Sequence, residues 1–574
     1  MKRITLILAA MAAMVFASCT KNASEDITSY YKAYTVSPEV TGFSPDNQPA
    51  VEVYAKTTDA GVDTKLDVTL KVDPSKDLVD KFNASVDEKH KATLLPSSAY
   101  VFKENKTTIA SMYRKSANIK IQLVFSDQLS PMTWYVLPIT LESVEGSSFA
   151  HLAEETVAYI AIKTAKTNPG KGTKDEPYLI YDAEDLLAID ERALPVDVSD
   201  ANKYAAAVPT YFKMVEDIDM TGENWTPINA ASPYAKKVDF DGNGKTISNL
   251  TYTGATYGGL FGVLCGEVYN LNLINANVNN KKDKSGLLCG YMGTGDVIYG
   301  VVHHCKVTGE LTVDNNTIGA IAGCMCGGEI YACEVDATIK MLGENRYYAG
   351  GIIGCGNKKP GYIHDCISKG SVESAGNLEK RTYNRNVAGI AGAFETKGYK
   401  IENCISLASI HCNAVAGGIV GHMNNNSWAK KSASDVDNYV IGCIAWNEQI
   451  LADNSRTKSL KLSRDDYAMG GGCIMGWGCP ENTLQNCWRK ADINFKVTCP
   501  DDPASETHFV PFDQENAGPG NPLVGIDCNY SDLWSMMYHG KASAKSETAS
   551  QIAKKLGWSE SIWDLSGDIP AIKR

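Results

Sequence analysis

The sequence predicts an all-β protein of two domains, an immunoglobulin-like β-sandwich followed by a parallel β-helix. Three observations carry this prediction. The chain has 574 residues, which is too long for a single hydrophobic core. Apolar and polar residues alternate with a period of two in several stretches of residues 30–163, as they do in half-buried strands. From residue 258 onward a short glycine-rich pattern recurs seven times, which is typical of a solenoid.

The first residues have the pattern of a secretory signal. Two basic residues precede the apolar run "ITLILAAMAAMVF", which is too short to span a membrane. Residues 16–19 ("FASC") resemble a bacterial lipobox, so 1–18 is predicted to be a lipoprotein signal peptide, Cys19 the lipidated residue and 19–29 a tether. An ordinary signal peptide with an unrelated cysteine is the alternative. Residues 24–26 ("SED") resemble the acidic surface-export tag of Bacteroidetes lipoproteins, which implies a lipid-anchored outer-membrane protein at the cell surface.

The charge balance argues against nucleic acid as a partner. The chain has 55 Lys and Arg residues against 67 Asp and Glu residues, a formal net charge of −12. Removal of the predicted signal peptide takes away two basic residues and no acidic ones, which leaves −14. Because nucleic-acid binding requires a basic surface, no nucleic-acid partner is predicted.

Residues 30–163 are predicted to form the β-sandwich. Segments such as "KLDVTLKVD" (65–73) and "ANIKIQLVF" (117–125) alternate apolar and polar residues and are separated by turn-forming residues. The stretches "LPSSAYVF" and "YVLPITLESV" resemble the N-terminal β-sandwich family of Bacteroidetes surface lipoproteins, which often precedes glycan-binding or glycosidase modules. A linker rich in Pro, Gly and Lys is predicted at 164–173.

The repeat region has the pattern Gly-x-Leu/Ile-x-Gly, with Ala for the first Gly in one copy. Its copies are "GGLFG", "GLLCG", "GAIAG", "GGIIG", "AGIAG", "GGIVG" and "GCIMG", spaced by 28, 33, 31, 38, 29 and 55 residues between 258 and 472. The units lack a helical pattern, so each is predicted to be one coil of three short strands. Glycine lets stacked backbones turn and approach closely. Membrane helix dimers use a similar spacing, but the polar residues that flank each copy disfavour that alternative.

The segments around the repeats resemble the GLUG-repeat adhesin family. They are "GTKDEPYLIYDAEDL", "YFKMVEDIDM", "WTPI", "FDGNGKTISNL" and the tail "LGWSESIWDLSGDIPAIK". The resemblance implies a right-handed parallel β-helix at 174–574, with core coils at 246–497 and an amphipathic helix covering one end. It also implies surface adhesion and ligand binding. Helical apolar spacing over 183–192, with Asp182 as N-cap, predicts a helix of this kind. Long insertions after residue 421 depart from the family pattern.

Six cysteines share one column when the repeats are aligned on their second halves. They are Cys305, Cys333, Cys366, Cys404, Cys443 and Cys487, with Leu271 in the first repeat. The leucine shows that an apolar residue fits the position. Stacked coils about 4.8 Å apart place the sulfurs poorly for disulfides and in too straight a row for a tetrahedral metal site. We therefore predict core filling, with scattered disulfides or a metal as alternatives. The sequence leaves open whether Cys324 and Cys355, or Cys499 and Cys528, form disulfides.

The column before the cysteines predicts a bend between two strands. It holds Asn270, His304, Ala332, Asp365, Asn403, Gly442 and Asn486. Six of these seven are residue types that tolerate a left-handed backbone. His304 is accordingly predicted to be a bend residue rather than a catalytic base.

Motifs for catalysis or metal binding are weak. "DFDGNG" (239–244) imitates a calcium loop, but Leu250 stands where such a loop needs a glutamate, so a tight turn is predicted. The outward positions beside the cysteine column, among them His303, His364 and Glu402, place no acidic pair on adjacent coils. We predict that the protein is not an enzyme and holds no cofactor and no metal.

The loops between coils are predicted to be the binding surface. They differ in length and mix aromatic, basic and amide residues, a combination suited to sugars. Tyr347, Tyr348, Tyr383 and Trp428 are the predicted ligand-binding residues, with solvated or packing roles as the alternative. The predicted function is adhesion or capture of an extracellular glycan, or of a host or neighbouring surface protein. The alternatives are a β-helix polysaccharide lyase or hydrolase, and a structural stalk or fimbria-like subunit.

Overall fold

The computed structural model divides the chain into two compact units, Met1–Asn168 and Pro169–Arg574. The predicted linker 164–173 spans this division. The structure describes residues 31–35, 39–57, 64–146, 150–152, 157–166, 170–230, 235–281, 284–295, 297–314, 317–343, 347–374, 385–412, 415–423, 438–452, 471–478, 483–497, 507–508 and 539–573. The predicted signal peptide, Cys19 and the tether lie outside these residues. No helix in the described ranges is both long enough and apolar enough to cross a membrane.

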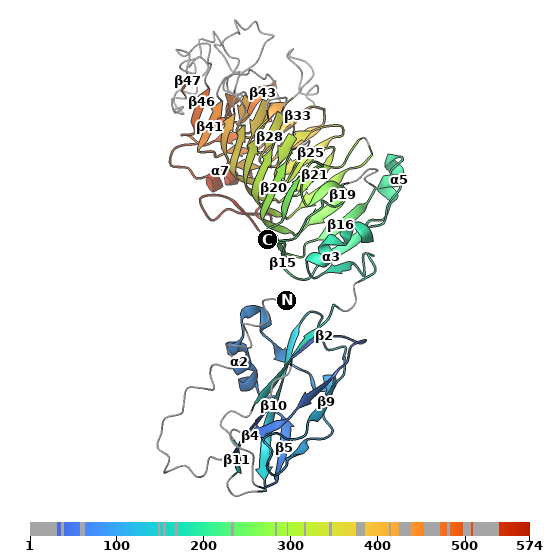
Figure 1. Ribbon diagram of the computed structural model, residues 1–574. Coiled ribbons are helices and arrows are strands. Elements are labelled where there is room, and N and C mark those ends of the chain that lie inside the picture. The colour runs from blue at the N-terminus through green and yellow to red at the C-terminus, as the bar shows by residue number, and fades with distance from the viewer. Residues whose placement is uncertain are drawn as a thin grey trace, which may run out of the picture. The chain divides into compact units, whose positions relative to one another are not determined.

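The first unit consists of β-sheets around one hydrophobic core (Figure 1). Its main sheet has the order β2 (Glu39–Phe43), β12 (Ala158–Thr164), β10 (Trp134–Glu145), β5 (Leu66–Val72) and β8 (Lys106–Ile109), with β6 (Thr93–Leu94) beside β10. One smaller sheet has the order β3 (Ala50–Val53), β9 (Ile119–Leu123) and β7 (Tyr100–Val101). Another has the order β11 (Ala150–Leu152), β1 (Tyr31–Thr35) and β4 (Ala55–Thr57). Leu70 of β5 and Ile121 of β9 are buried in the same core. The predicted alternation of buried and exposed residues is confirmed in both strands.

Short helical segments also occur in the first unit. They are α2 (Lys76–Ser85), η3 (Glu88–His90) and η4 (Ser97–Ala99). The sequence did not predict α2, and the structure shows why its signal is weak. The helix has a short apolar stripe of Leu78, Val79 and Phe82, but it buries none of its residues fully and has no side-chain cap at Ser75.

The second unit begins with a cap of short elements. These are β13 (Tyr178–Ile180), α3 (Ala183–Leu187), α4 (Ile189–Arg192), α5 (Ala201–Ala206), β14 (Thr210–Met214), β15 (Ile218–Asp219), β16 (Lys237–Asp241), β17 (Thr246–Ser248) and β18 (Thr251–Gly254). The predicted N-cap is confirmed, because the Asp182 carboxylate accepts from the amide of Asp185 at 3.1 Å. The predicted single helix is divided at Ala188. Leu186 and Ile189 are buried in the main core, but Leu187 points away and is 39% exposed.

Parallel strands stack along the repeat region in a β-helix-like architecture (Figure 1). Two successive coils contain β28 (Tyr347–Gly350), β29 (Ile353–Gly356), β30 (Gly361–His364), β31 (Ile367–Ser374), then β32 (Arg385–Ala388), β33 (Ala391–Phe394), β34 (Tyr399–Glu402), β35 (Ile405–Ser406) and β36 (Ser409–Cys412). Each strand pairs in parallel with its equivalent in the next coil. The prediction of three strands per coil was one too few, since the chain changes direction inside the glycine motif, between β28 and β29.

The remaining coils follow the same plan. Before β28 lie β19 (Phe261–Tyr269), β20 (Asn272–Asn280), β21 (Cys289–Met292), β22 (Gly300–His303), β23 (Lys306–Val313), β24 (Thr317–Gly319), β25 (Ala322–Met325), β26 (Gly328–Tyr331) and β27 (Glu334–Met341). After β36 lie β37 (Val415–Gly417), β38 (Val420–Met423), β39 (Tyr439–Ile441), β40 (Ile444–Ala445), β41 (Gln449–Ala452), β42 (Gly471–Gly472), β43 (Met475–Gly478), β44 (Leu484–Gln485), β45 (Trp488–Arg489) and β46 (Asn494–Val497). The unit ends with β47 (Thr507–His508), β48 (Lys541–Ala542), α7 (Ala549–Leu556), β49 (Trp563–Asp564) and β50 (Ala571–Ile572).

The cysteine column fills the core, as predicted. All six cysteines are buried, and among the described residues they carry thiols rather than disulfides. Each sulfur lies near the carbonyl two residues back, for example Cys305 Sγ at 3.2 Å from His303 O and Cys366 Sγ at 3.1 Å from His364 O. The row therefore supplies small apolar groups whose weak donors are satisfied by the backbone.

The bend column is also confirmed. All seven of its residues have positive φ angles, from 48° at Ala332 to 59° at Gly442. Ala332 shows that the coil imposes this conformation even on a residue that does not favour it. His304, with φ 52°, is a bend residue as predicted. In "DFDGNG", Asn243 and Gly244 both have positive φ, which is the geometry of a tight turn.

Candidate functional site

Four aromatic rings stack on the outer face of the second unit, one from each of four successive coils. Strand pairing puts Tyr269, His303, Tyr331 and His364 in register on β19, β22, β26 and β30. Their ring centroids lie 5.1, 4.7 and 5.1 Å apart, and the planes differ by no more than 12°. The residues just before them, such as Val302 and Ile330, are buried, so alternation along each strand turns the rings outward.

A second outward column, two residues earlier on each strand, carries carboxylates. It places Glu267, Val301, Glu329 and Tyr362 in register. Glu267 Oε1 lies 2.9 Å from His303 Nε2, and Glu329 Oε1 lies 3.1 Å from His364 Nε2. Each histidine is therefore held by a glutamate from an earlier coil. We call these two columns, together with Glu402, the ring strip.

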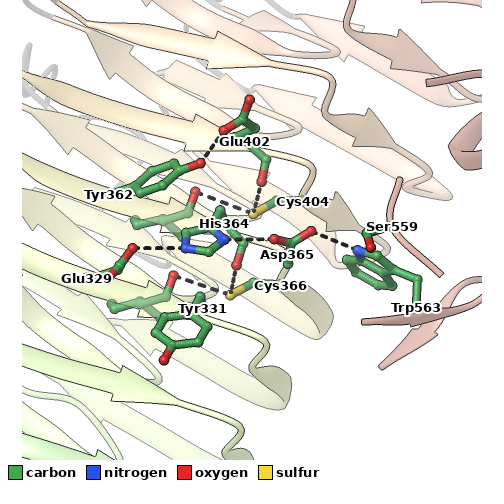
Figure 2. Close-up of polar contacts among 12 residues, drawn as sticks. Glu329, Tyr331, Tyr362, His364, Asp365, Cys366, Glu402, Cys404, Ser559 and Trp563 are labelled. Atoms are coloured by element: carbon green, nitrogen blue, oxygen red, sulfur yellow. Dashed lines mark hydrogen bonds and ion pairs between the residues drawn. The ribbon is translucent and has the colours of Figure 1, made fainter. Parts of the chain in front are cut away.

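Figure 2 shows the part of the ring strip that reaches β34. The Tyr362 hydroxyl donates to the Glu402 carboxylate, and Lys400 Nζ lies 2.6 Å from the same group. Although burial alone would raise the pKa of Glu402, its bonds with Lys400 and Tyr362 outweigh that effect and hold the pKa below its ordinary value. Glu402 is therefore a carboxylate at neutral pH.

His364 lies between two carboxylates and connects the strip to the C-terminal segment (Figure 2). Its Nδ1 is 2.7 Å from Asp365 Oδ2, and the other oxygen of Asp365 accepts from Trp563 Nε1 at 2.8 Å. Burial alone would lower the pKa of His364, but the hydrogen bonds with Asp365 and Glu329 prevail and raise it. The left-handed backbone of Asp365, φ 51°, aims its side chain at both partners.

The C-terminal segment packs beside the strip along several coils. Thr548 and Gln551 form a capping box at the start of α7, and Gly557 ends the helix with φ 76°. Trp558 and Trp563 are buried against residues of successive coils, among them Ile367 and Ile405. This packing anchors the tail, and the indole of Trp563 then fixes Asp365.

His303 and His304 form a neighbouring pair. Their Nδ1 atoms are 2.8 Å apart, so one ring must donate to the other. If His303 is neutral and donates from Nε2 to Glu267, its Nδ1 accepts from His304. This arrangement orders the strip at its second coil and leaves both imidazoles engaged within the protein.

The strip presents ring edges and carboxylates to solvent. The faces of the inner rings are covered by neighbouring rings, so they offer no platform for a stacked sugar. Glu267 and Glu329 keep side-chain exposures of 38% and 41%, which leaves each able to accept further hydrogen bonds. A polar ligand with several hydroxyl donors suits this surface.

The four loop aromatics predicted to bind ligand do not lie in this strip. Tyr348 of β28 is partly buried against Cys324, Cys326 and Cys355. Tyr383, Trp428 and the side chain of Tyr347 lie outside the described residues, as do Cys499 and Cys528. The prediction for these loop residues stays a prediction.

Glu267, Glu329 and Tyr362 were missed by sequence reasoning. Only the outward column containing His303 and His364 was searched for acidic residues. The same repeat alignment, read two residues earlier in each coil, would have found Glu267, Glu329 and Tyr362, because alternate residues of a strand lie on the same face. In the described residues, no cluster of three or more His, Cys, Asp or Glu side chains is arranged to hold a metal ion.

Comparisons with known proteins give matches to parts of the chain. A family model described as "-like, N-terminal domain" matches residues 23–148. Halomucin of Haloquadratum walsbyi is 30% identical over 199 residues, which cover 32% of this chain and only 2% of Halomucin. A "putative immunoglobulin A1 protease" from Bacteroides ovatus is 21% identical, with a TM-score of 0.44, over 70% of this chain and 94% of that chain. EndoBT-3987 of Bacteroides thetaiotamicron, solved with a Man5GlcNAc product, is 11% identical, with a TM-score of 0.20. The match covers 39% of this chain and 54% of that chain.

These names correct the prediction that the protein is not an enzyme. A protein named as a protease and one solved with a reaction product are among the structures to which this chain is similar. The exclusion also rested on one outward column, and the adjacent column contains Glu267 and Glu329, which pair with His303 and His364. One outward column was therefore too narrow a basis for predicting that the protein is not an enzyme.

Proposed function

We propose that this is a lipid-anchored cell-surface protein of the GLUG-repeat adhesin type that binds a neutral glycan along the ring strip. The observation that carries the proposal is the alignment of two half-exposed carboxylates, Glu267 and Glu329, beside the ring edges of four successive coils. A carboxylate accepts hydrogen bonds from two sugar hydroxyls at once, and such charge-assisted bonds are strong. The parallel coils provide a rigid support, which limits the entropy lost on binding.

The geometry supports an extended ligand. Equivalent positions recur about every 4.8 Å along stacked coils, so Glu267 and Glu329, which lie two coils apart with Val301 between them, are separated by roughly 10 Å. A polysaccharide also presents hydroxyls at regular steps along its length. The carboxylates of the strip would repel an anionic glycan, which favours a neutral one.

The test is a glycan array followed by calorimetry on the glycans retained. Glu329→Gln and Tyr331→Phe are each expected to weaken binding about tenfold, because each removes one hydrogen bond to a sugar hydroxyl. Glu310→Gln is the matched control, since Glu310 is exposed on β23 and lies outside the strip. Absence of binding by the wild type, or equal binding by all variants, would contradict the proposal.

Glycan cleavage is the second candidate function. The observation that favours it is two hydrogen-bonded pairs, Glu329 with His364 and Tyr362 with Glu402, whose rings stack on each other. These groups are able to donate and accept protons. Analysis of the same incubations for shortened glycans separates the two functions. Cleavage would be established if the Glu310→Gln variant forms shortened glycan and the Glu402→Gln variant does not. If the glycan stays unchanged in all incubations, binding without cleavage is the function.

The lipid anchor and the loop aromatics extend the proposal. Further contacts with the glycan at the coil edges would come from Tyr347, Tyr348, Tyr383 and Trp428. The alternative partner is a host protein or a neighbouring surface protein.

Cys19→Ser is expected to move the protein from the outer-membrane fraction to the soluble fraction, because the lipid is the proposed attachment. Fractionation followed by immunoblotting measures this shift. A variant that stays in the membrane fraction after a salt wash would contradict lipid anchoring at Cys19.

A further inference from the structure

Cys324 and Cys355 occupy one column on neighbouring coils, outside the cysteine row that fills the core. Cys324 lies on β25 and Cys355 on β29, and the two are direct partners in the parallel pairing. Their sulfur atoms are 3.0 Å apart. This is about 1 Å longer than a covalent S–S bond, so a small side-chain rotation would bring them to bonding distance.

The backbone spacing at this pair also permits a bridge. The Cα atoms of partner residues on adjacent strands are about 4.8 Å apart, which falls inside the separation of about 4.4–6.8 Å seen for disulfides. The core row has the same spacing, but its sulfurs are held at backbone carbonyls. The chain segment between the two cysteines forms one complete coil, so a bridge would close the coil onto its neighbour without changing the strand register.

The core row differs from this pair in its hydrogen bonds. Cys333 Sγ lies 3.2 Å from Tyr331 O, and Cys404 Sγ lies 3.3 Å from Glu402 O, so each thiol in the row has a backbone acceptor. The row thiols also contact one another. The Cys355 thiol, by contrast, donates to the sulfur of Cys324. The difference between the two sets is therefore the backbone carbonyl that accepts from each thiol of the row.

A third thiol lies beside the pair. Cys326 belongs to the same buried cluster, and the side chains of Tyr291 and Tyr348 pack against it. Hydrogen bonds with Cys326 and Cys355, together with burial, raise the pKa of Cys324 well above its ordinary value. A buried thiol with a raised pKa reacts slowly, so any exchange must take place while this coil is still open.

We propose that Cys324 and Cys355 form a disulfide that closes during folding after export, with Cys326 remaining a thiol. The oxidant is a protein or small-molecule disulfide. One thiolate attacks this disulfide and releases a first thiolate, which leaves a mixed disulfide on the chain. The second cysteine, as a thiolate, then attacks the bound sulfur of the chain and releases the second thiolate. Two electrons pass to the oxidant, and two protons leave the cysteines.

The test maps disulfides in full-length wild-type protein, refolded from the reduced state with oxidised glutathione and alkylated before digestion. Trypsin cuts between the two cysteines at Lys340, and cyanogen bromide cuts at Met325, which separates Cys324 from Cys326. We expect a linked peptide that joins Cys324 to Cys355, with Cys326 alkylated. The linked species should be about 2 Da lighter than the sum of its reduced peptides, because two hydrogens are lost.

Matched variants and timing sharpen the result. Cys355→Ala should abolish the linked peptide, whereas Cys366→Ala, in the core row, should leave it unchanged. Oxidised glutathione added after folding should form the bond at least tenfold more slowly than when present during refolding. Alkylation of both cysteines in the refolded wild type would overturn the proposal. So would a bridge from Cys324 to Cys326, or equal bridging among the core-row cysteines.

Discussion

Gly354→Ala is expected to lower the free energy of unfolding of the second unit by at least about 3 kcal/mol. A β-carbon at Gly354 would lie 2.4 Å from the amide nitrogen of Ile318 and 2.5 Å from the carbonyl oxygen of Gly323. Both atoms belong to the backbone of the preceding coil, which is paired on either side and has little room to move. Urea denaturation followed by circular dichroism measures the loss, with the first unit as an internal reference.

Gly244→Ala is the matched control for this substitution. Gly244 has φ +73°, yet no atom lies within 4 Å of the position its β-carbon would take. Its replacement should cost only the strain of a left-handed backbone, about 1 kcal/mol. Equal losses at the two sites would show that backbone conformation, rather than the close approach of coils, requires glycine in the repeat motif.

Trp563→Ala is expected to destabilise the second unit by about 3–5 kcal/mol. The side chain is fully buried among residues of several coils, and its indole donates to Asp365. Trp563→Phe keeps much of the apolar contact but leaves the buried Asp365 oxygen without that donor, so a smaller loss of about 1–3 kcal/mol is expected. Denaturant midpoints of the two variants separate packing from hydrogen bonding. A phenylalanine variant as stable as wild type would mean that the bond to Asp365 contributes nothing.

The same network makes stability depend on pH. Burial opposes protonation of His364, but Asp365 and Glu329 outweigh it and raise the pKa above the ordinary value of 6.5. Tyr331, Tyr362 and Glu402 are the other titratable groups that face this ring. The folded chain therefore holds the proton more tightly than the unfolded chain. The resulting stabilisation is complete below about pH 6.5 and is lost as pH rises through the folded pKa.

His364→Gln should accordingly cost more stability at pH 5.5 than at pH 9. Unfolding measured at the two pH values gives the difference directly. His411→Gln is the control, because His411 is exposed on β36 and lies outside the strip. A loss at His364 that is equal at both pH values, or larger at pH 9, would contradict the assigned direction of the pKa shift.

The repeat alignment predicted structure wherever side-chain type decides local geometry. Asparagine, aspartate and glycine mark the bend because they tolerate positive φ, and Leu271 in the cysteine column marks that position as core. The capping box at Thr548 and Gln551 was an equally local signal for α7 and went unused. The split at Ala188 and the extra strand in each coil were not predicted, because both depend on how the coil bends in three dimensions.

The sequence by itself determined the two-unit all-β organisation, the parallel coil repeat, the buried cysteine row and the bend beside it. These follow from periodicity and residue type, which are properties of short segments. Only the tertiary structure decided that rings and carboxylates from successive coils form one strip, and that Trp563 reaches Asp365 across 198 residues of chain. Such contacts depend on coil register and on where the tail packs, and both are set by the packing of the whole unit.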